Sequence, residues 1–134
     1  MKRNNLFDIL KESPPEVTRS GRKIWRDNQG RVHRDNDRPA IIDANGDQMW
    51  YNAGDLHREN DLPAITQQVD KYTVWYTDGK LHRENDLPAL IGEYGYKAWY
   101  KNGVRHRDND KPAIIYEDGS KGWYINGELM RLEP

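Results

Sequence analysis

Five tryptophans and four histidines recur along this chain at almost equal intervals. The tryptophans are Trp25, Trp50, Trp75, Trp99 and Trp123, and the histidines are His33, His57, His82 and His106. Self-similarity with a period of roughly 20 to 50 residues is typical of repeat architectures, in which each unit packs only against its neighbours. We therefore expect a tandem array, in which no single Trp or His can be interpreted alone.

The unit is clearest from Trp75 to Leu90, which reads Trp-Tyr-Thr-Asp-Gly-Lys-Leu-His-Arg-Glu-Asn-Asp-Leu-Pro-Ala-Leu. It recurs over residues 50–65 and 99–114, whereas Trp25 opens a degenerate first copy. In the last copy, which begins at Trp123, Met130-Arg131 replaces His-Arg. Terminal copies that differ from the others are expected in a stacked array, because their outer faces meet water.

The composition indicates a thin, repetitive core. Of the 134 residues, 35 % are apolar and 32 % are charged, and the formal net charge is −1. Such a chain has no positive field for a polyanion, so we expect no nucleic-acid binding by bulk charge. There is no cysteine, which excludes disulfides and thiolate sites. No stretch approaches the roughly 20 apolar residues of a membrane span and no secretory signal is legible, so we expect a soluble, cytoplasmic protein.

Turn signals divide each unit into short strands. Asp-Gly or Asn-Gly between apolar or aromatic residues is the strongest local signal for a two-residue hairpin loop, and it occurs at Asp78-Gly79, Asn102-Gly103 and Asn126-Gly127. This register pairs Thr77 with Lys80, Tyr76 with Leu81, and Trp75 with His82.

A second turn precedes each Trp, at Asn45-Gly46, Tyr94-Gly95 and Asp118-Gly119. Two-residue loops at these turns would pair Ile41 with Trp50, Leu90 with Trp99 and Ile114 with Trp123. Each unit of about 24 residues is then a three-stranded antiparallel meander, with Ile or Leu, Trp and His on one face and Ala, Tyr and Leu on the other. The extra residue between Pro63 and Trp75 falls in the turn at residues 67–70, where an insertion is tolerated.

The predicted fold is all-β: an elongated array of about five such meanders over residues 23–134, with units starting near each Trp. Residues 1–22 precede it as a helix and a Pro-rich linker. Residues 5–12 place Leu6, Ile9 and Leu10 on one side of a short helix, which Pro14-Pro15 would end. We interpret this helix as a cap on the first unit's edge, with a docking peptide as the alternative. Which sheet face is buried stays open, and an open sheet allows a homodimer.

The corners between units carry most of the chemically distinctive residues. An arginine follows each histidine, at Arg34, Arg58, Arg83 and Arg107. These arginines are expected to pair with an aspartate three residues on, namely Asp37, Asp61, Asp86 and Asp110. Such pairs would satisfy each corner internally. If the guanidinium groups are instead exposed, they form a row that binds carboxylates or phosphates of a partner.

The four histidines do not predict a metal site. Three strands per unit at about 4.8 Å separate neighbouring histidines by roughly 14 Å, whereas zinc ligands lie about 2 Å from one ion. His-Arg-Asp at Asp35 and Asp108 matches the start of a kinase catalytic loop, but Ala40 and Ala113 stand where that loop needs Asn. No Ser-His-acid set is legible. We therefore predict no enzyme activity and no cofactor.

The pattern Trp-Tyr-x-Asn-Gly-x-x-His-Arg-x-Asn-Asp-x-Pro-Ala-Ile resembles tandem repeats of bacteriophages and large DNA viruses, and more distantly MORN and YwqK-type β-hairpin repeats. The resemblance covers residues 25–131. It implies an accessory protein that binds, and can inhibit, a host protein. The His-Arg and Pro-Ala corners differ from the glycine spacing of MORN repeats, so the lipid and scaffold roles proposed for that family are not carried over.

Two functions are compatible with these features. The first is a non-enzymatic binding module that engages a host protein through its corners or an exposed strand face. The alternative is capture of a nucleotide or glycan between aromatic, His and Arg side chains of adjacent units, as in a counter-defence sponge or a wall-binding repeat. The candidate binding residues are Arg34, Arg58, Arg83, Arg107, His57, His82, His106, Trp50, Trp75 and Trp99.

Overall fold

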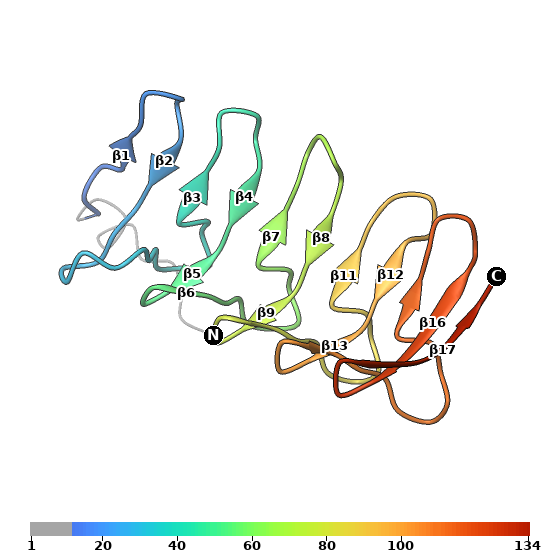
Figure 1. Cartoon of the computed structure of the whole chain (residues 1–134). Helices are drawn as coiled ribbons and strands as arrows, with labels where there is room; N and C mark the ends of the chain where they lie inside the picture. Colours follow the sequence, from blue (N-terminus) through green and yellow to red (C-terminus); the bar gives the residue numbers. More distant parts are fainter. Residues whose placement is uncertain (1–11) are drawn as a thin grey trace.

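The computed structural model describes residues 12–134, and over this range it contains only β-strands and turns. Figure 1 shows a row of hairpins that runs from the N-terminal to the C-terminal end, with shorter hairpins set at an angle below them. The elongated all-β array of hairpin repeats is thus confirmed. The helix predicted over residues 5–12 lies, apart from Glu12, outside the described residues.

One long antiparallel sheet runs the length of the array. Its 11 strands follow chain order: β1 (Glu16–Val17), β2 (Lys23–Ile24), β3 (Ile41–Ile42), β4 (Gln48–Met49), β7 (Ile65–Thr66), β8 (Thr73–Val74), β11 (Leu90–Ile91), β12 (Lys97–Ala98), β15 (Ile114–Ile115), β16 (Lys121–Ile125) and β17 (Glu128–Glu133). Most of these strands are only 2 residues long. The sheet begins at β1, inside the segment predicted as a linker.

Three inner repeats each add a short hairpin outside the long sheet. These hairpins are β5 (Tyr51–Asn52) with β6 (Asp55–Leu56), β9 (Tyr76–Thr77) with β10 (Lys80–Leu81), and β13 (Tyr100–Lys101) with β14 (Val104–Arg105). The predicted register is confirmed, because Lys80 pairs with Thr77 and Leu81 with Tyr76. Asp78 and Gly79 have φ angles of 48° and 79°, the left-handed geometry that a two-residue type I′ loop requires.

The register predicted for the other turn is wrong by one residue. Ile41 pairs with Met49, and in the same way Leu90 pairs with Ala98 and Ile114 with Gly122. At the first of these turns the Asp43 N–H donates to the Asp47 carbonyl at 2.9 Å, and Gly46 has a φ of 92°. This is a three-residue loop with a glycine bulge. Trp50 therefore follows β4 as the chain leaves the long sheet, and the unit is two hairpins, not a three-stranded meander.

The core consists of two lines of side chains along the array, one on each side of the chain. The tryptophans of the first four units are 7 % to 9 % exposed, and one alanine per unit, at Ala40, Ala64, Ala89 and Ala113, is 0 % exposed. The backbone joins them, since the Trp50 N–H donates to the carbonyl of Ala64, the alanine of the same unit, at 2.8 Å. On the other side of the chain, Ile41, Val74, Ala98 and Ile114 of the long sheet are at most 8 % exposed. Both sides of the chain therefore contribute to the core.

Candidate functional site

Each corner turns on two successive residues with left-handed backbone. Asn85 and Asp86 have φ angles of 62° and 55°, a conformation that Asn and Asp tolerate better than other residues with a side chain. The other corners repeat this geometry at Asn36-Asp37, Asn60-Asp61 and Asn109-Asp110. The recurrent Asn-Asp pair is therefore explained by the reversal of the chain.

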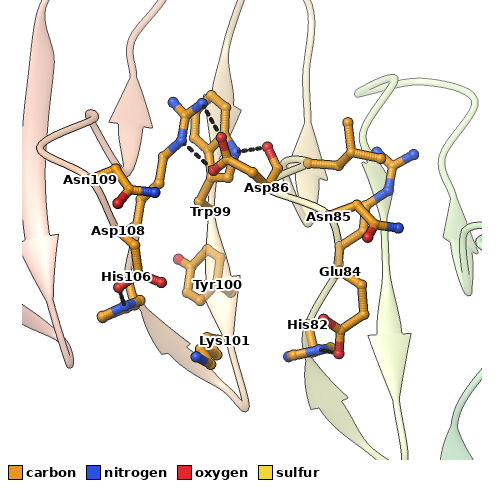
Figure 2. A pocket seen from close by; sticks show the side chains of 13 residues that line it. His82, Glu84, Asn85, Asp86, Trp99, Tyr100, Lys101, His106, Asp108 and Asn109 are labelled. Atoms are coloured by element: carbon orange, nitrogen blue, oxygen red, sulfur yellow. Dashed lines mark hydrogen bonds and ion pairs between the residues drawn. The ribbon is translucent and has the colours of Figure 1, made fainter.

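The aspartate of each corner is bound by the Trp and Arg of the next repeat, as Figure 2 shows for Asp86. The Trp99 indole N–H donates to the Asp86 carbonyl at 3.0 Å. The Arg107 guanidinium donates to both carboxylate oxygens of Asp86, at 2.8 and 3.2 Å. The same guanidinium lies 3.8 Å from the centroid of a Trp99 ring and donates to the Pro112 carbonyl at 3.0 Å. We name this arrangement the Trp–Arg–Asp clamp.

The clamp recurs at the other junctions between repeats, although at the last one the Arg131–Asp110 ion pair is longer, at 3.6 Å. Its other members are Trp50, Arg58 and Asp37; Trp75, Arg83 and Asp61; and Trp123, Arg131 and Asp110. At the N-terminal end Arg34 lies over Trp25, and Glu12 takes the place of the aspartate.

The predicted pairing of each arginine with an aspartate in its own corner is wrong. Arg83 pairs with Asp61 of the preceding unit, at 2.8 Å, and leaves Asp86 of its own corner to Arg107. The physical reason is that each guanidinium lies flat on its own Trp and donates to its own Pro carbonyl, so its remaining N–H groups point across the junction. The sequence contained an indication of this stacking, because Arg follows Trp at the same distance along the chain in each of the last four units, as a repeated Trp–Arg contact requires.

The low exposure of these arginines and the lowered pKa values of their aspartate partners show that the guanidinium groups are already bound within the molecule. The side chains of Arg58, Arg83 and Arg107 are only 13 % to 15 % exposed. Hydrogen bonds from Arg107 and then Lys111 lower the pKa of Asp86 to about 2, and the hydrogen bond from Arg83 lowers the pKa of Asp61. The corner arginines therefore join repeats and leave no open row of guanidinium groups.

The histidines also connect repeats. The His82 Nε2–H donates to Glu84 at 2.8 Å, and Nδ1 accepts the backbone N–H of Asn102 in the next repeat at 3.0 Å. Because an amide N–H only donates, Nδ1 carries no proton and the tautomer is fixed. The same two bonds occur at His33, His57 and His106. All the sequence-predicted site residues thus lie in contacts within and between repeats.

A shallow pocket lies between the corners of the third and fourth repeats (Figure 2), with His82, Trp99 and Arg107 among its lining residues. Its volume is about 160 Å³, below the roughly 300 to 1,000 Å³ of ordinary small-molecule sites. The pocket also carries a highly exposed carboxylate, since the Glu84 side chain is 80 % exposed. The equivalent side chain of the preceding repeat, Glu59, is 78 % exposed.

A second surface, which the sequence did not single out, is formed by tyrosines. Of the 8 tyrosines in the chain, all but Tyr94 are half-buried. We name these residues the tyrosine face: Tyr51, Tyr76, Tyr100 and Tyr124, each directly after a Trp, and Tyr72, Tyr96 and Tyr116, beside strands of the long sheet. The sequence predicted that Tyr points away from the Trp face, but it gave no reason to expect the second row.

The tyrosine rings beside the long sheet contact one another, and the two rows lie close enough to affect each other's pKa values. The Tyr96 ring packs edge-on against Tyr72 and Tyr116, with centroids 6.0 and 6.3 Å apart. Burial raises the pKa of Tyr96, and the nearby hydroxyls of Tyr100, Tyr72 and Tyr116 add to the rise in pKa. In the other row, burial raises the pKa of Tyr76, with Tyr51 and Tyr100 as further contributors. The hydroxyls of the two rows therefore lie within electrostatic range of each other.

Arg105 lies among these rings, where the other inner repeats have leucine. Its guanidinium donates to the Tyr100 hydroxyl at 2.8 Å and lies 5.0 Å from the centroid of the Tyr124 ring. Its Nε is buried without a hydrogen-bond partner. The tyrosine face thus carries one embedded positive charge.

Other recognisable chemistry is sparse over residues 12–134. No group of three or more His, Asp or Glu side chains in this range could hold a metal ion. The described chain also has no helix with the length and apolar character needed to cross a membrane. No family model, curated protein or solved structure matches this chain.

Proposed function

We propose that this chain is a non-enzymatic protein-binding module, and that the tyrosine face is its binding surface. The proposal is supported by the observation that different side chains make the contacts between repeats and form the exposed surface. Trp, Arg and His hold the repeats together, whereas Tyr recurs half-exposed along one face. Tyrosine is enriched at protein interfaces, because it offers a large, rigid apolar ring with a hydrogen-bonding hydroxyl.

The partner we propose is a host protein. The resemblance to phage and viral repeats supports this choice, and the extended row of rings suits a partner that spans several repeats. Capture of a nucleotide or glycan at the corners has less support. The pocket there is small. Its Arg107 already donates to the preceding repeat, and its His82 already accepts a hydrogen bond from the next repeat.

The experiment that tests this function compares two double variants of the tagged chain in a lysate of its native host. Tyr76→Ala with Tyr100→Ala removes two central rings of the tyrosine face. Glu59→Ala with Glu84→Ala is the matched control, because it changes two equally spaced and highly exposed corner residues. Native mass spectrometry identifies what each variant retains, and unfolding followed by Trp fluorescence shows that each variant is folded.

We expect the tyrosine variant to lose the partner that the wild type and the glutamate variant retain. Interface tyrosines commonly contribute about 2 kcal/mol each, which is roughly thirtyfold in affinity. Loss of the partner in the glutamate variant alone would move the binding surface to the corners. A released nucleotide or glycan without any protein would instead support the ligand-capture alternative.

A further inference from the structure

The outermost strand of the long sheet, β17, is unusually exposed. It ends the strand order of the sheet, and all 6 of its residues are exposed. These include Leu129, Met130 and Leu132, at 44 %, 62 % and 59 %. An exposed edge strand offers unpaired backbone groups to another strand. With 6 residues, β17 is also longer than most strands of this sheet, which have 2.

The backbone direction along β17 shows which groups are free. The Ala113 N–H donates to the Gly122 carbonyl at 2.8 Å, so the polar groups of Gly122 face β15. Gly122 pairs with Leu132, while Trp123 and Lys121 pair with Arg131 and Glu133. Because bonding direction alternates along an antiparallel pair, the N–H and C=O of Leu132 point outward from the sheet.

We propose that β17 pairs antiparallel with β17 of a second copy of this chain, with Leu132 on the two-fold axis. The outward N–H and C=O of the two Leu132 residues then bond each other, as an isologous interface requires. The pairing joins two long sheets edge to edge. This inference is independent of the function proposed for the tyrosine face.

Charge complementarity favours a second copy as the occupant. With Leu132 on the axis, Arg131 lies opposite Glu133 of the partner subunit, and the reciprocal pair forms as well. These are the non-hydrogen-bonded positions, where opposite side chains are closest, with about 4.5 Å between Cα atoms. Arg131 and Glu133 already contact each other within one chain at 3.1 Å, and their side chains are 46 % and 53 % exposed. Each arginine can therefore reach both carboxylates.

The same pairing would join the two tyrosine faces. A Cβ added at Gly122 would lie 3.1 Å from Tyr124 and 3.3 Å from Leu132, so Leu132 is on the tyrosine side of the sheet. In the dimer the two Leu132 side chains meet at the end of each face. Two short faces would then become one longer surface.

The test measures the mass of the intact chain by sedimentation velocity over a wide concentration range. We expect the wild type to dimerise, and Glu133→Lys to associate at least about tenfold more weakly, because two arginine–lysine pairs then face each other. Glu117→Lys is the matched control, since it makes the same charge change at an exposed turn residue outside β17, and it should dimerise as the wild type does. Leu132→Pro, which removes only an outward N–H, should also be monomeric.

A mixing experiment separates pairing from a folding defect. Arg131→Glu and Glu133→Lys should each self-associate more weakly than the wild type, yet their mixture should give the mixed dimer in native mass spectra, because every facing pair is again of opposite charge. Near-wild-type circular dichroism and a cooperative urea transition establish that each variant is folded. A monomeric wild type, undiminished association of Glu133→Lys, or absence of the mixed dimer from folded variants would overturn the proposal.

Discussion

At the scale of single residues, the corner arginine combines three contacts that are each modest. Stacking of a guanidinium on an indole contributes about 0.5 to 2 kcal/mol depending on burial. The ion pair contributes less, because Asp86 is 43 % exposed and solvent screens it. The bond to the Pro carbonyl satisfies a backbone group that the corner would otherwise leave unpaired. Stacking and burial therefore account for most of the stabilisation by Arg107.

Replacing Arg107 by Met should remove the ion pair and the hydrogen bonds of the guanidinium while keeping an apolar side chain next to Trp99. The pKa of Asp86 should rise from about 2 yet stay below its ordinary value, because Lys111 still donates to it at 2.8 Å. Because the pKa of Asp86 is lower in the folded state, its ionised carboxylate stabilises the fold at any pH above 3.8, the pKa in the unfolded chain. This stabilisation is lost as the pH falls towards about 2. The variant should therefore lose less stability in acid. NMR titration of the Asp86 carboxyl carbon measures the pKa.

The control for this experiment is Lys101→Met, which removes an exposed cation from β13 without touching the clamp. It should leave the pKa of Asp86 where the wild type has it. Urea unfolding at neutral pH should show a loss of about 2 kcal/mol for Arg107→Met and little change for the control. An unchanged Asp86 titration in Arg107→Met would show that Arg107 is not the source of the shift.

At the scale of elements, turn chemistry decided which predictions succeeded. Asp78-Gly79 behaves as its sequence indicates, with both residues left-handed, and its register was predicted correctly. At Tyr94-Gly95 both residues are again left-handed. Even so, the Gly92 N–H also donates to the Tyr96 carbonyl, and this added bulge moves Leu90 opposite Ala98. A dipeptide predicts that a turn exists, but the bulge beside it depends on contacts that the dipeptide does not encode.

The candidate site was predictable in its composition but not in its connections. Sequence reasoning found the arginines, histidines and aspartates of the corners, because they recur with the repeat. It paired Arg83 with Asp86, although Arg83 contacts Asp61. Equivalent aspartates one period apart are indistinguishable in a periodic sequence. The stacking of Arg83 on Trp75 and its bond to the Pro88 carbonyl select the aspartate of the preceding unit.

The histidine bond across each junction is testable by hydrogen exchange. In His82→Ala the amide of Asn102 loses its acceptor, and it should exchange roughly fivefold faster, which corresponds to about 1 kcal/mol. The neighbouring Gly103 amide donates to the Leu81 carbonyl at 2.8 Å and should stay protected. Glu84→Ala is the control, because it removes the partner of Nε2 and leaves Nδ1 in place. Equal exchange at Asn102 in both variants would contradict the assigned bond.

At the scale of the whole molecule, stability should be a sum over repeats and their junctions. The long sheet has no central strand on which the others depend, and each clamp joins only adjacent units. Arrays of this kind fold as nearly one-dimensional systems. The molecule should therefore tolerate the loss of an inner unit, which a globular core of this size would not.

Deletion of residues 50–74 tests this expectation. It joins Met49 to Trp75 and brings Arg83 to Asp37, so every remaining clamp is complete. The shortened chain should fold with lower stability and with a smaller dependence of unfolding free energy on urea, in proportion to the surface it buries. Urea unfolding followed by circular dichroism and Trp fluorescence measures both the free energy of unfolding and its dependence on urea. Deletion of residues 50–61 removes half a unit and should prevent folding, and equal behaviour of the two deletions would refute the additive description.

The position of the Trp–Arg–Asp clamp also bears on how the gene can change. Each unit contributes to two clamps. Its aspartate binds the Trp and Arg of the next unit, and its own Trp and Arg bind the aspartate of the previous unit. A duplicated unit inserted in phase therefore finds the matching half already present on both sides. Recombination between the repeats of the gene can lengthen or shorten the protein by whole units without a new contact having to evolve, and natural length variants should differ in steps of one repeat.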